Sequence, residues 1–170
     1  MFLPTDIVVV TGANGHLASH IVDQLLAFPD GPRVRGTVRS QESRDTISEY
    51  YGGKEVGSRL EVFCVPDMLG EGAFDEVVEG ATHIAHVASP LVIGRVTDVA
   101  KELLDPAILG TTGIFKAAHK TRSIRAVVIT SSFGAAFDPA AGWRPSYTYT
   151  SVRPLDGSSN LTLLSRFNLD

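Results

Sequence analysis

The sequence has little of what marks disulfide-rich, membrane-spanning or nucleic-acid-binding proteins. Its single cysteine, Cys64, excludes a disulfide framework within the chain. No apolar run approaches the roughly 18 residues that a membrane span needs. The net charge of −4 offers no broad basic surface for nucleic acid. Internal repeats and low-complexity tracts are also missing, so we expect an ordinary globular domain.

What is present fits that expectation. Hydrophobic residues make up 44% and charged residues 20% of the 170 positions, enough for one domain with a sizeable core. The N-terminal stretch has no basic segment before its apolar run, so we expect no signal peptide. A lone cysteine without a signal peptide suits a reducing compartment, and we expect a cytoplasmic location.

Segment 6–26, DIVVVTGANGHLASHIVDQLL, organises the rest of the chain. It opens with a short β-branched run, typical of a buried strand, and from His16 its apolar residues recur at helical spacing. In the turn between them, Gly12 allows a sharp bend and Gly15 allows close approach of a pyrophosphate. Ala18 leaves room for the helix to pack on the strand. The free N–H groups of the first helical turn favour an anion.

Further strands and helices alternate along the chain. Strands are expected at 34–39, 60–65, 82–88 and 124–129. Helices are expected at 46–51, around 74–78 and at 96–119, the last with kinks at Pro106 and Gly110. This alternation predicts an α/β fold, a doubly wound parallel sheet of five strands in the order 3-2-1-4-5.

Five motifs carry a family resemblance: TGANGHLASH, VRGTVRS, PDM, HVASP and ITSSF. Together they resemble the extended short-chain dehydrogenase/reductases, in the dihydroflavonol-reductase and fungal carbonyl-reductase branch of the NAD-dependent epimerase/dehydratase family. The resemblance runs from about residue 6 to about residue 149. It implies an incomplete NADP-binding Rossmann domain at 1–150, followed by an irregular tail at 151–170.

The end of the second strand bears on the choice of cofactor. An NAD site usually carries an acidic residue here, which bonds the ribose 2′-hydroxyl and repels a 2′-phosphate. This chain has Arg39, which can pair with a phosphate bidentately, and Ser40 and Arg44 lie close by. In the family the same arginine contacts the NADP 2′-phosphate. We therefore expect NADP(H) rather than NAD(H), the alternative being a solvated arginine at a strand end.

The resemblance implies more cofactor contacts where the other strands end. Asp67 would bond the adenine amino group, although a helix or turn cap explains it equally well. The HVASP segment would pass beneath the nicotinamide ribose, and the first two residues of TSS would line the cofactor. His86 is interpreted as a strand-packing histidine, because the sequence shows no carboxylate or cysteine partner for it. No metal site is predicted. The predicted cofactor-binding residues are Gly12, Ala13, Asn14, Gly15, His16, Leu17, Ala18, Arg39, Asp67, Met68, Val87, Ala88, Ser89, Thr130 and Ser131.

Carbonyl reduction in this family needs a group that binds the carbonyl and a group that supplies a proton. By its position in ITSSF, Ser132 would bind the carbonyl oxygen. The proton comes from a tyrosine followed four residues later by a lysine on the next helix, where the ammonium lowers the pKa of the phenol. Beyond the fifth strand, Tyr147 is followed by Ser151 and Tyr149 by Arg153. The expected pair is missing there, and we expect both tyrosines to lie in a loop.

Residues 151–170, SVRPLDGSSNLTLLSRFNLD, show neither a helical period nor a glycine-bounded strand. The simplest hypothesis is a chain truncated or rerouted before the family's sixth strand and substrate lobe. The fifth strand would then be an apolar sheet edge, and the long helix would lose a packing partner. Both changes favour self-association.

Several functions remain open at this point. The first is an NADPH-dependent oxidoreductase that reduces an aldehyde or ketone, with a small carbonyl compound as substrate. The second is a non-catalytic NADP-binding module, and the third is an inactive fragment. Among enzymes, a sugar-nucleotide epimerase or dehydratase would share the same first half. No nucleic-acid or membrane partner is expected.

Overall fold

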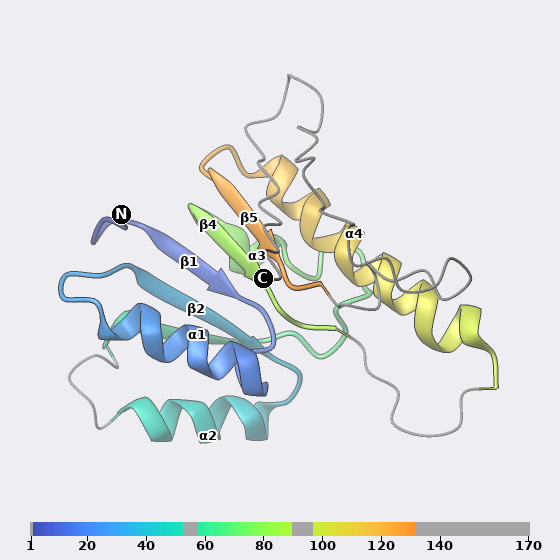
Figure 1. Ribbon diagram of the computed structural model, residues 1–170, viewed down its shortest axis with the longest axis horizontal. Coiled ribbons are helices and arrows are strands. Elements are labelled where there is room, and N and C mark those ends of the chain that lie inside the picture. Colours follow the sequence, from blue (N-terminus) through green and yellow to red (C-terminus); the bar gives the residue numbers. More distant parts are fainter. Residues whose placement is uncertain (1, 53–57, 90–96, 132–170) are drawn as a thin grey trace, which may run out of the picture.

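The computed structural model describes residues 2–52, 58–89 and 97–131, which form a five-stranded parallel sheet. The strand order is β3-β2-β1-β4-β5, as the sequence predicts (Figure 1). All the strand pairs are parallel. The strands are β1 (Ile7–Val10), β2 (Arg33–Val38), β3 (Leu60–Cys64), β4 (His83–His86) and β5 (Ala126–Ile129).

Helices cover both faces of the sheet. On one face lie α1 (His16–Ala27) and α2 (Gln41–Gly52), and on the other α3 (Asp75–Val78) and α4 (Asp105–Lys120) (Figure 1). The alternation of β1 explains the two layers. Val8 and Val10 pack with residues of α1, whereas Val9 packs with residues of α3 and α4. A strand buried on both faces is therefore apolar throughout, which is why β1 reads as a continuous valine run.

Several elements differ in length from the sequence-based expectation; β5, for example, begins at Ala126 rather than at residue 124. Side-chain contacts explain two of the differences. Helix α2 begins at Gln41 rather than near Thr46, because Ser40 caps it: the N–H of Ser43 donates to the Ser40 hydroxyl at 3.2 Å. Strand β4 ends at His86 rather than at residue 88. The N–H groups of the next two residues donate to a threonine side chain instead of to a neighbouring strand.

The long helix departs from regularity before α4. Residues Ala100–Leu104 form a π-helical turn, η2, that leads directly into α4. Pro106, near the start of α4, has no N–H to donate to the preceding turn, which accounts for the irregularity at this point. Gly110 does not interrupt α4. It makes room for Met68, whose Cε would lie 2.7 Å from a Cβ at this position.

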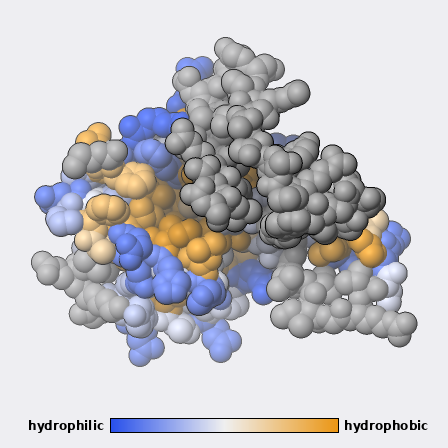
Figure 2. Space-filling view, in the orientation of Figure 1, coloured by the Kyte–Doolittle hydropathy of each residue, from blue (hydrophilic) through white to orange (hydrophobic). Residues whose placement is uncertain are grey.

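Apolar side chains remain exposed at one end of the molecule. Figure 2 shows apolar surface over the first part of α4. Val99, Leu103, Leu104, Ile108 and Leu109 are all more than one-third exposed there. Strand β5 is the last strand of the sheet in the described part of the chain, and its Val128 is 48% exposed. None of the described helices is both long and apolar enough to cross a membrane.

Candidate functional site

The turn after β1 brings the chain against the segment that follows β4. Gly12 has a φ of +69°, in the left-handed region that favours glycine. A Cβ there would lie 3.2 Å from the Cβ of Ala88 and 3.3 Å from its Cα. A side chain at Gly12 would therefore meet both backbone strain and a crowded neighbour.

The first turn of α1 is arranged to receive an anion. Gly15 is the N-cap residue and offers no side-chain cap, and the first turn of the helix carries no acidic residue. The N–H groups at the start of a helix have no internal partners and carry partial positive charge. Asn14, His16 and Leu17 are exposed around this end, whereas Ala18 is fully buried beneath it. Close packing of α1 on the sheet needs the small side chain of Ala18.

Strand β2 holds the same turn from the other side. The Gly12 N–H donates to the Thr37 hydroxyl at 3.1 Å, and the Ala13 N–H donates to the Thr37 carbonyl at 2.8 Å. Gly36 is required here as well, because a Cβ would lie 2.7 Å from that of Ala13. Sequence reasoning missed both β2 residues as supports of the turn, although both lie inside the VRGTVRS motif that it singled out.

Arg39 lies just beyond the carboxyl end of β2. Its side chain is exposed and makes no ion pair with the described residues. Beside it, Ser40 donates a hydroxyl hydrogen bond to Ser43 at 3.0 Å, and the Asn14 amide donates to the same Ser43 oxygen at 3.3 Å. The start of α2 is thereby tied to the glycine turn. Ser43 was not predicted as part of the site, because this contact joins residues that are distant in sequence.

At the end of β3, Asp67 caps a turn: its Oδ1 accepts the Leu69 N–H at 2.9 Å. The carboxylate is nevertheless exposed, so one oxygen makes the cap while the side chain stays open to a ligand. Met68 packs against α4 at Gly110. The Asp67 carboxylate is thus exposed, whereas the Met68 side chain is half-buried against α4.

The segments after β4 and β5 complete this edge of the sheet. Val87 and Ala88 are half-buried and Ser89 is exposed. Both the backbone N–H and the hydroxyl of Thr130 donate to the carbonyl of His86, at 3.0 Å and 3.1 Å, which joins the two segments. Ser131, the next residue, is exposed.

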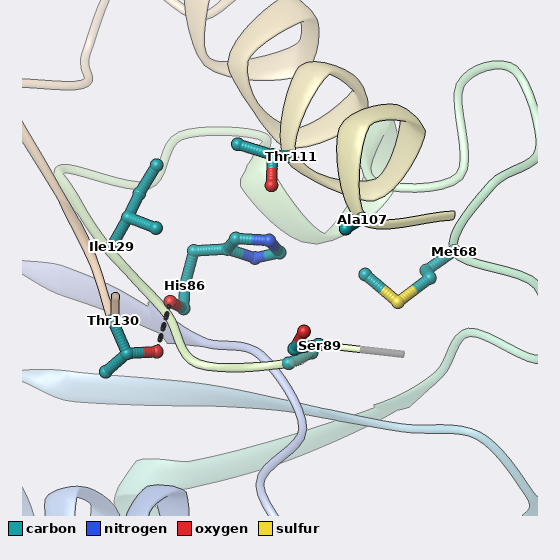
Figure 3. Close-up of a pocket in the computed structure, with 8 residues that line it drawn as sticks. Met68, His86, Ser89, Ala107, Thr111, Ile129 and Thr130 are labelled. Carbon is teal, nitrogen blue, oxygen red and sulfur yellow. Dashed lines mark hydrogen bonds between the residues drawn. The ribbon is translucent and has the colours of Figure 1, made fainter. Parts of the chain in front are cut away.

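A small cavity of about 50 Å³ lies between the ends of β4 and β5 and the first turns of α4. Figure 3 shows the His86 ring pointing from β4 toward Ala107 and Met68, with Thr130 and Ser89 below the ring in this view. The cavity is large enough for a water molecule and far too small for a nucleotide. A dinucleotide would instead lie along the open carboxyl edge of the strands.

The residues considered for catalysis lie beyond the part of the chain that the structure describes. Ser132, Tyr147 and Tyr149 lie outside the described residues, as does the predicted tail 151–170. A tyrosine and a lysine four residues apart do occur once in the sequence, at Tyr50 and Lys54. Tyr50 lies nine residues into α2, about 13 Å of helix away from the carboxyl edge where α2 begins.

The five-stranded order and the glycine turn at the β1–α1 junction together define a Rossmann-type domain. Its sequence matches the 3-beta hydroxysteroid dehydrogenase/isomerase family over residues 9–143, and the chain belongs to that family. This is consistent with the resemblance to extended short-chain dehydrogenase/reductases and NAD-dependent epimerases/dehydratases.

Similar proteins include several reductases. Aldehyde reductase 2 of Sporidiobolus salmonicolor is 43% identical over 133 residues, which cover 78% of this chain and 37% of the reductase. An NAD-dependent epimerase/dehydratase of Alternaria alternata is 39% identical over 131 residues, 74% of this chain and 36% of that protein. The structure of Gre2 from Candida albicans in complex with NADPH superposes with a TM-score of 0.68 at 40% identity, over 76% of this chain and 38% of Gre2.

A second solved structure is that of yeast methylglyoxal/isovaleraldehyde reductase Gre2 complexed with NADPH. It has a TM-score of 0.69 at 35% identity, over 86% of this chain and 46% of the reductase. The chain therefore spans less than half the length of the relatives it matches. No group of three or more histidine, cysteine or acidic side chains within the described residues could hold a metal ion.

Proposed function

We propose that this chain binds NADP(H) along the carboxyl edge of its sheet. The observation that carries the proposal is the exposed Arg39 guanidinium, which lies beyond β2 beside the glycine turn and has no ion-pair partner among the described residues. A guanidinium in this place matches the geometry and charge of a 2′-phosphate. The NADPH complexes of the two Gre2 proteins support the same assignment.

The residues present suit such a cofactor. In this proposal the pyrophosphate rests on the N–H groups of α1 behind Gly12 and Gly15, with Ala13, Asn14, His16, Leu17 and Ala18 forming the turn and first helical residues. The exposed Asp67 carboxylate would bond the adenine amino group, with the next residue, Met68, beside it. Val87, Ala88 and Ser89 lie under the nicotinamide ribose, with Thr130 and Ser131 at its far side. All of them come from the loops or the first helical turn that follow the carboxyl ends of the strands, where open α/β folds bind their ligands.

Titration of the full chain with NADPH and with NADH, followed by nicotinamide fluorescence, tests this proposal. We expect tighter binding of NADPH, and Arg39→Ala should remove most of the difference. Losing one charge-assisted phosphate contact at an exposed site should weaken NADPH binding by about tenfold to a hundredfold. Arg33→Ala is the matched control, because Arg33 is also exposed on β2 but at the opposite end of the strand. Equal loss in both variants would contradict the assignment of Arg39.

We further propose that the chain is the cofactor half of an NADPH-dependent reductase of aldehydes or ketones. The bound cofactor would supply the hydride to the carbonyl carbon, and the oxygen would take its proton from water. Ser132 would donate a hydrogen bond to the carbonyl oxygen and so stabilise the charge that develops there. Aldehyde reductase 2 and the methylglyoxal/isovaleraldehyde reductase Gre2 support this substrate class. Oxidation of NADPH with methylglyoxal or isovaleraldehyde, abolished in Ser132→Ala, is the expected result.

A non-catalytic NADP-binding module is the second candidate, and one observation favours it. The two tyrosines in the described part of the chain, Tyr50 and Tyr51, both lie near the end of α2 and away from the candidate site. Neither is placed to protonate an alkoxide there. Binding of NADPH without turnover of either carbonyl compound would support the module and contradict the reductase.

A further inference from the structure

One threonine side chain joins the glycine turn to the segment after β4. The hydroxyl oxygen of Thr11 accepts the N–H groups of Val87 and Ala88, each at 3.0 Å. The same oxygen lies 2.9 Å from Nδ1 of His86. Thr11 is fully buried and His86 is 3% exposed, so water does not compete for these contacts.

These three contacts fix the protonation of the histidine. A hydroxyl oxygen has two lone pairs and one hydrogen. Both lone pairs of Thr11 are used by the backbone N–H groups, so its hydrogen must be donated to Nδ1 of His86. Nδ1 must then be unprotonated, and the ring is neutral with its hydrogen on Nε2. Burial also lowers the pKa of His86 to about 4, which agrees with a neutral ring at neutral pH.

The rest of His86 holds the same junction. Its carbonyl accepts both donors of Thr130 at the end of β5. Its ring and that of Phe74 make a T-shaped contact with 6.1 Å between ring centroids. Nε2 has no hydrogen-bond partner among the described residues, and the ring borders the small cavity beside α4 (Figure 3). The ends of β1, β4 and β5 are thus linked through one residue.

We propose that His86 is a positioning residue for the nicotinamide side of the cofactor site: by accepting the Thr11 hydrogen, it leaves both Thr11 lone pairs free to hold the Val87 and Ala88 amides in place. The proposal rests on the proposed binding of NADP(H). It gives His86 no contact with the reacting atoms. Its effect passes through Thr11 to the backbone that supports the nicotinamide ribose, and it leaves the 2′-phosphate side at Arg39 untouched.

The test compares two ligands on the full chain. NADPH reaches both sides of the site, whereas adenosine 2′,5′-bisphosphate carries only the adenine and 2′-phosphate side. In His86→Leu, which cannot accept the Thr11 hydrogen, we expect the Kd for NADPH to rise about tenfold, the value of one lost buried hydrogen bond. The Kd for adenosine 2′,5′-bisphosphate should stay within about twofold. A merely structural role would weaken both ligands alike.

Two further variants show whether His86 acts through Thr11. His86→Asn retains an acceptor oxygen near the position of Nδ1 and should restore NADPH binding to within about threefold. Thr11→Val removes the hydroxyl and with it both amide contacts, so it should weaken NADPH binding at least as much as His86→Leu, and the double variant should be no worse than Thr11→Val alone. His83→Leu is the matched control: its Nδ1 also contacts a threonine hydroxyl, that of Thr82, at 2.9 Å but at the opposite end of β4.

The outcomes separate this inference from the proposed function. If the unmodified chain binds neither ligand, NADP(H) binding fails and the inference fails with it. If the chain binds both ligands and His86→Leu weakens them equally, or additively with Thr11→Val, only the positioning role is overturned. The unmodified chain also gives a test that needs no variant to fold. Nitrogen NMR of histidine-labelled protein should show His86 protonated at Nε2 alone, and a proton on Nδ1 would refute the proposal.

Discussion

Substituting Gly12 by alanine tests how closely the glycine turn and the segment after β4 must approach. At a φ of +69° an alanine costs about 1–2 kcal/mol, partly offset by about 0.4–1 kcal/mol from the reduced freedom of the unfolded chain. In addition, the new Cβ would lie 3.2 Å from the Cβ of Ala88, and such crowding costs about 1–3 kcal/mol. We therefore expect Gly12→Ala to destabilise the fold by about 2–4 kcal/mol.

Gly80→Ala is the matched control, because it isolates the crowding. Gly80 has almost the same φ, +68°, but a Cβ there would meet nothing within 4 Å. Urea denaturation of both variants should give a smaller loss for Gly80→Ala, about 1 kcal/mol, with NADPH binding unchanged. Gly12→Ala should also weaken NADPH binding, because the displaced Ala88 lies in the candidate site. Equal destabilisation of the two variants, or equal loss of binding, would refute the reasoning.

Three further predictions concern the fold and its association. The pKa of His86 falls from 6.5 in the unfolded chain to about 4 in the folded one, so the unfolded chain binds more protons between these pH values. The free energy of unfolding should therefore drop by about 3 kcal/mol as the pH falls from 7 to 4. Urea denaturation at each pH should show that His86→Asn loses this part of the pH dependence. Tyr51→Phe removes the 2.6 Å bond that the phenol donates to Asp23, between α2 and α1, and should cost about 1–2 kcal/mol by the same assay, whereas no change would show the bond to be dispensable. We also propose self-association through the exposed start of α4 and the edge of β5. Sedimentation should show a mass above that of the monomer, and Ile108→Glu or Val128→Lys should reduce it. A monomer at all concentrations would contradict the proposal.

The elements of the fold could be predicted because each has a local signature. The valine run of β1, the glycine turn and the helical period from His16 all lie within one short segment, and the parallel order of five strands follows from alternation of strands and helices. The prediction of strand order was confirmed. The boundaries near Ser40 and His86 were wrong by a few residues, because side-chain caps and side-chain acceptors set them rather than hydrophobic pattern.

The supports of the candidate site could not be predicted in the same way. Thr11 and Val87 are 76 residues apart, and the Thr37 hydroxyl reaches Gly12 across 25 residues. No periodicity encodes such contacts, since they arise only when β1, β2 and β4 come together. His86 shows the limit of pattern reading most clearly. The sequence offered no carboxylate or cysteine partner for it, and its partner is a hydroxyl within the glycine turn itself.

The candidate cofactor residues do not all depend on the same part of the fold. Those of the glycine turn, Arg39 and the Val87–Ser89 segment follow β1, β2 and β4, and each of these strands pairs on both sides within the described sheet. Thr130 and Ser131 follow β5, which pairs only with β4 there and leaves Val128 exposed. An edge strand is held by fewer hydrogen bonds and opens more readily than an inner one. Binding of the adenine and 2′-phosphate part of NADP(H) should therefore tolerate changes at β5. Reduction of a carbonyl compound, by contrast, should be sensitive to changes that loosen β5.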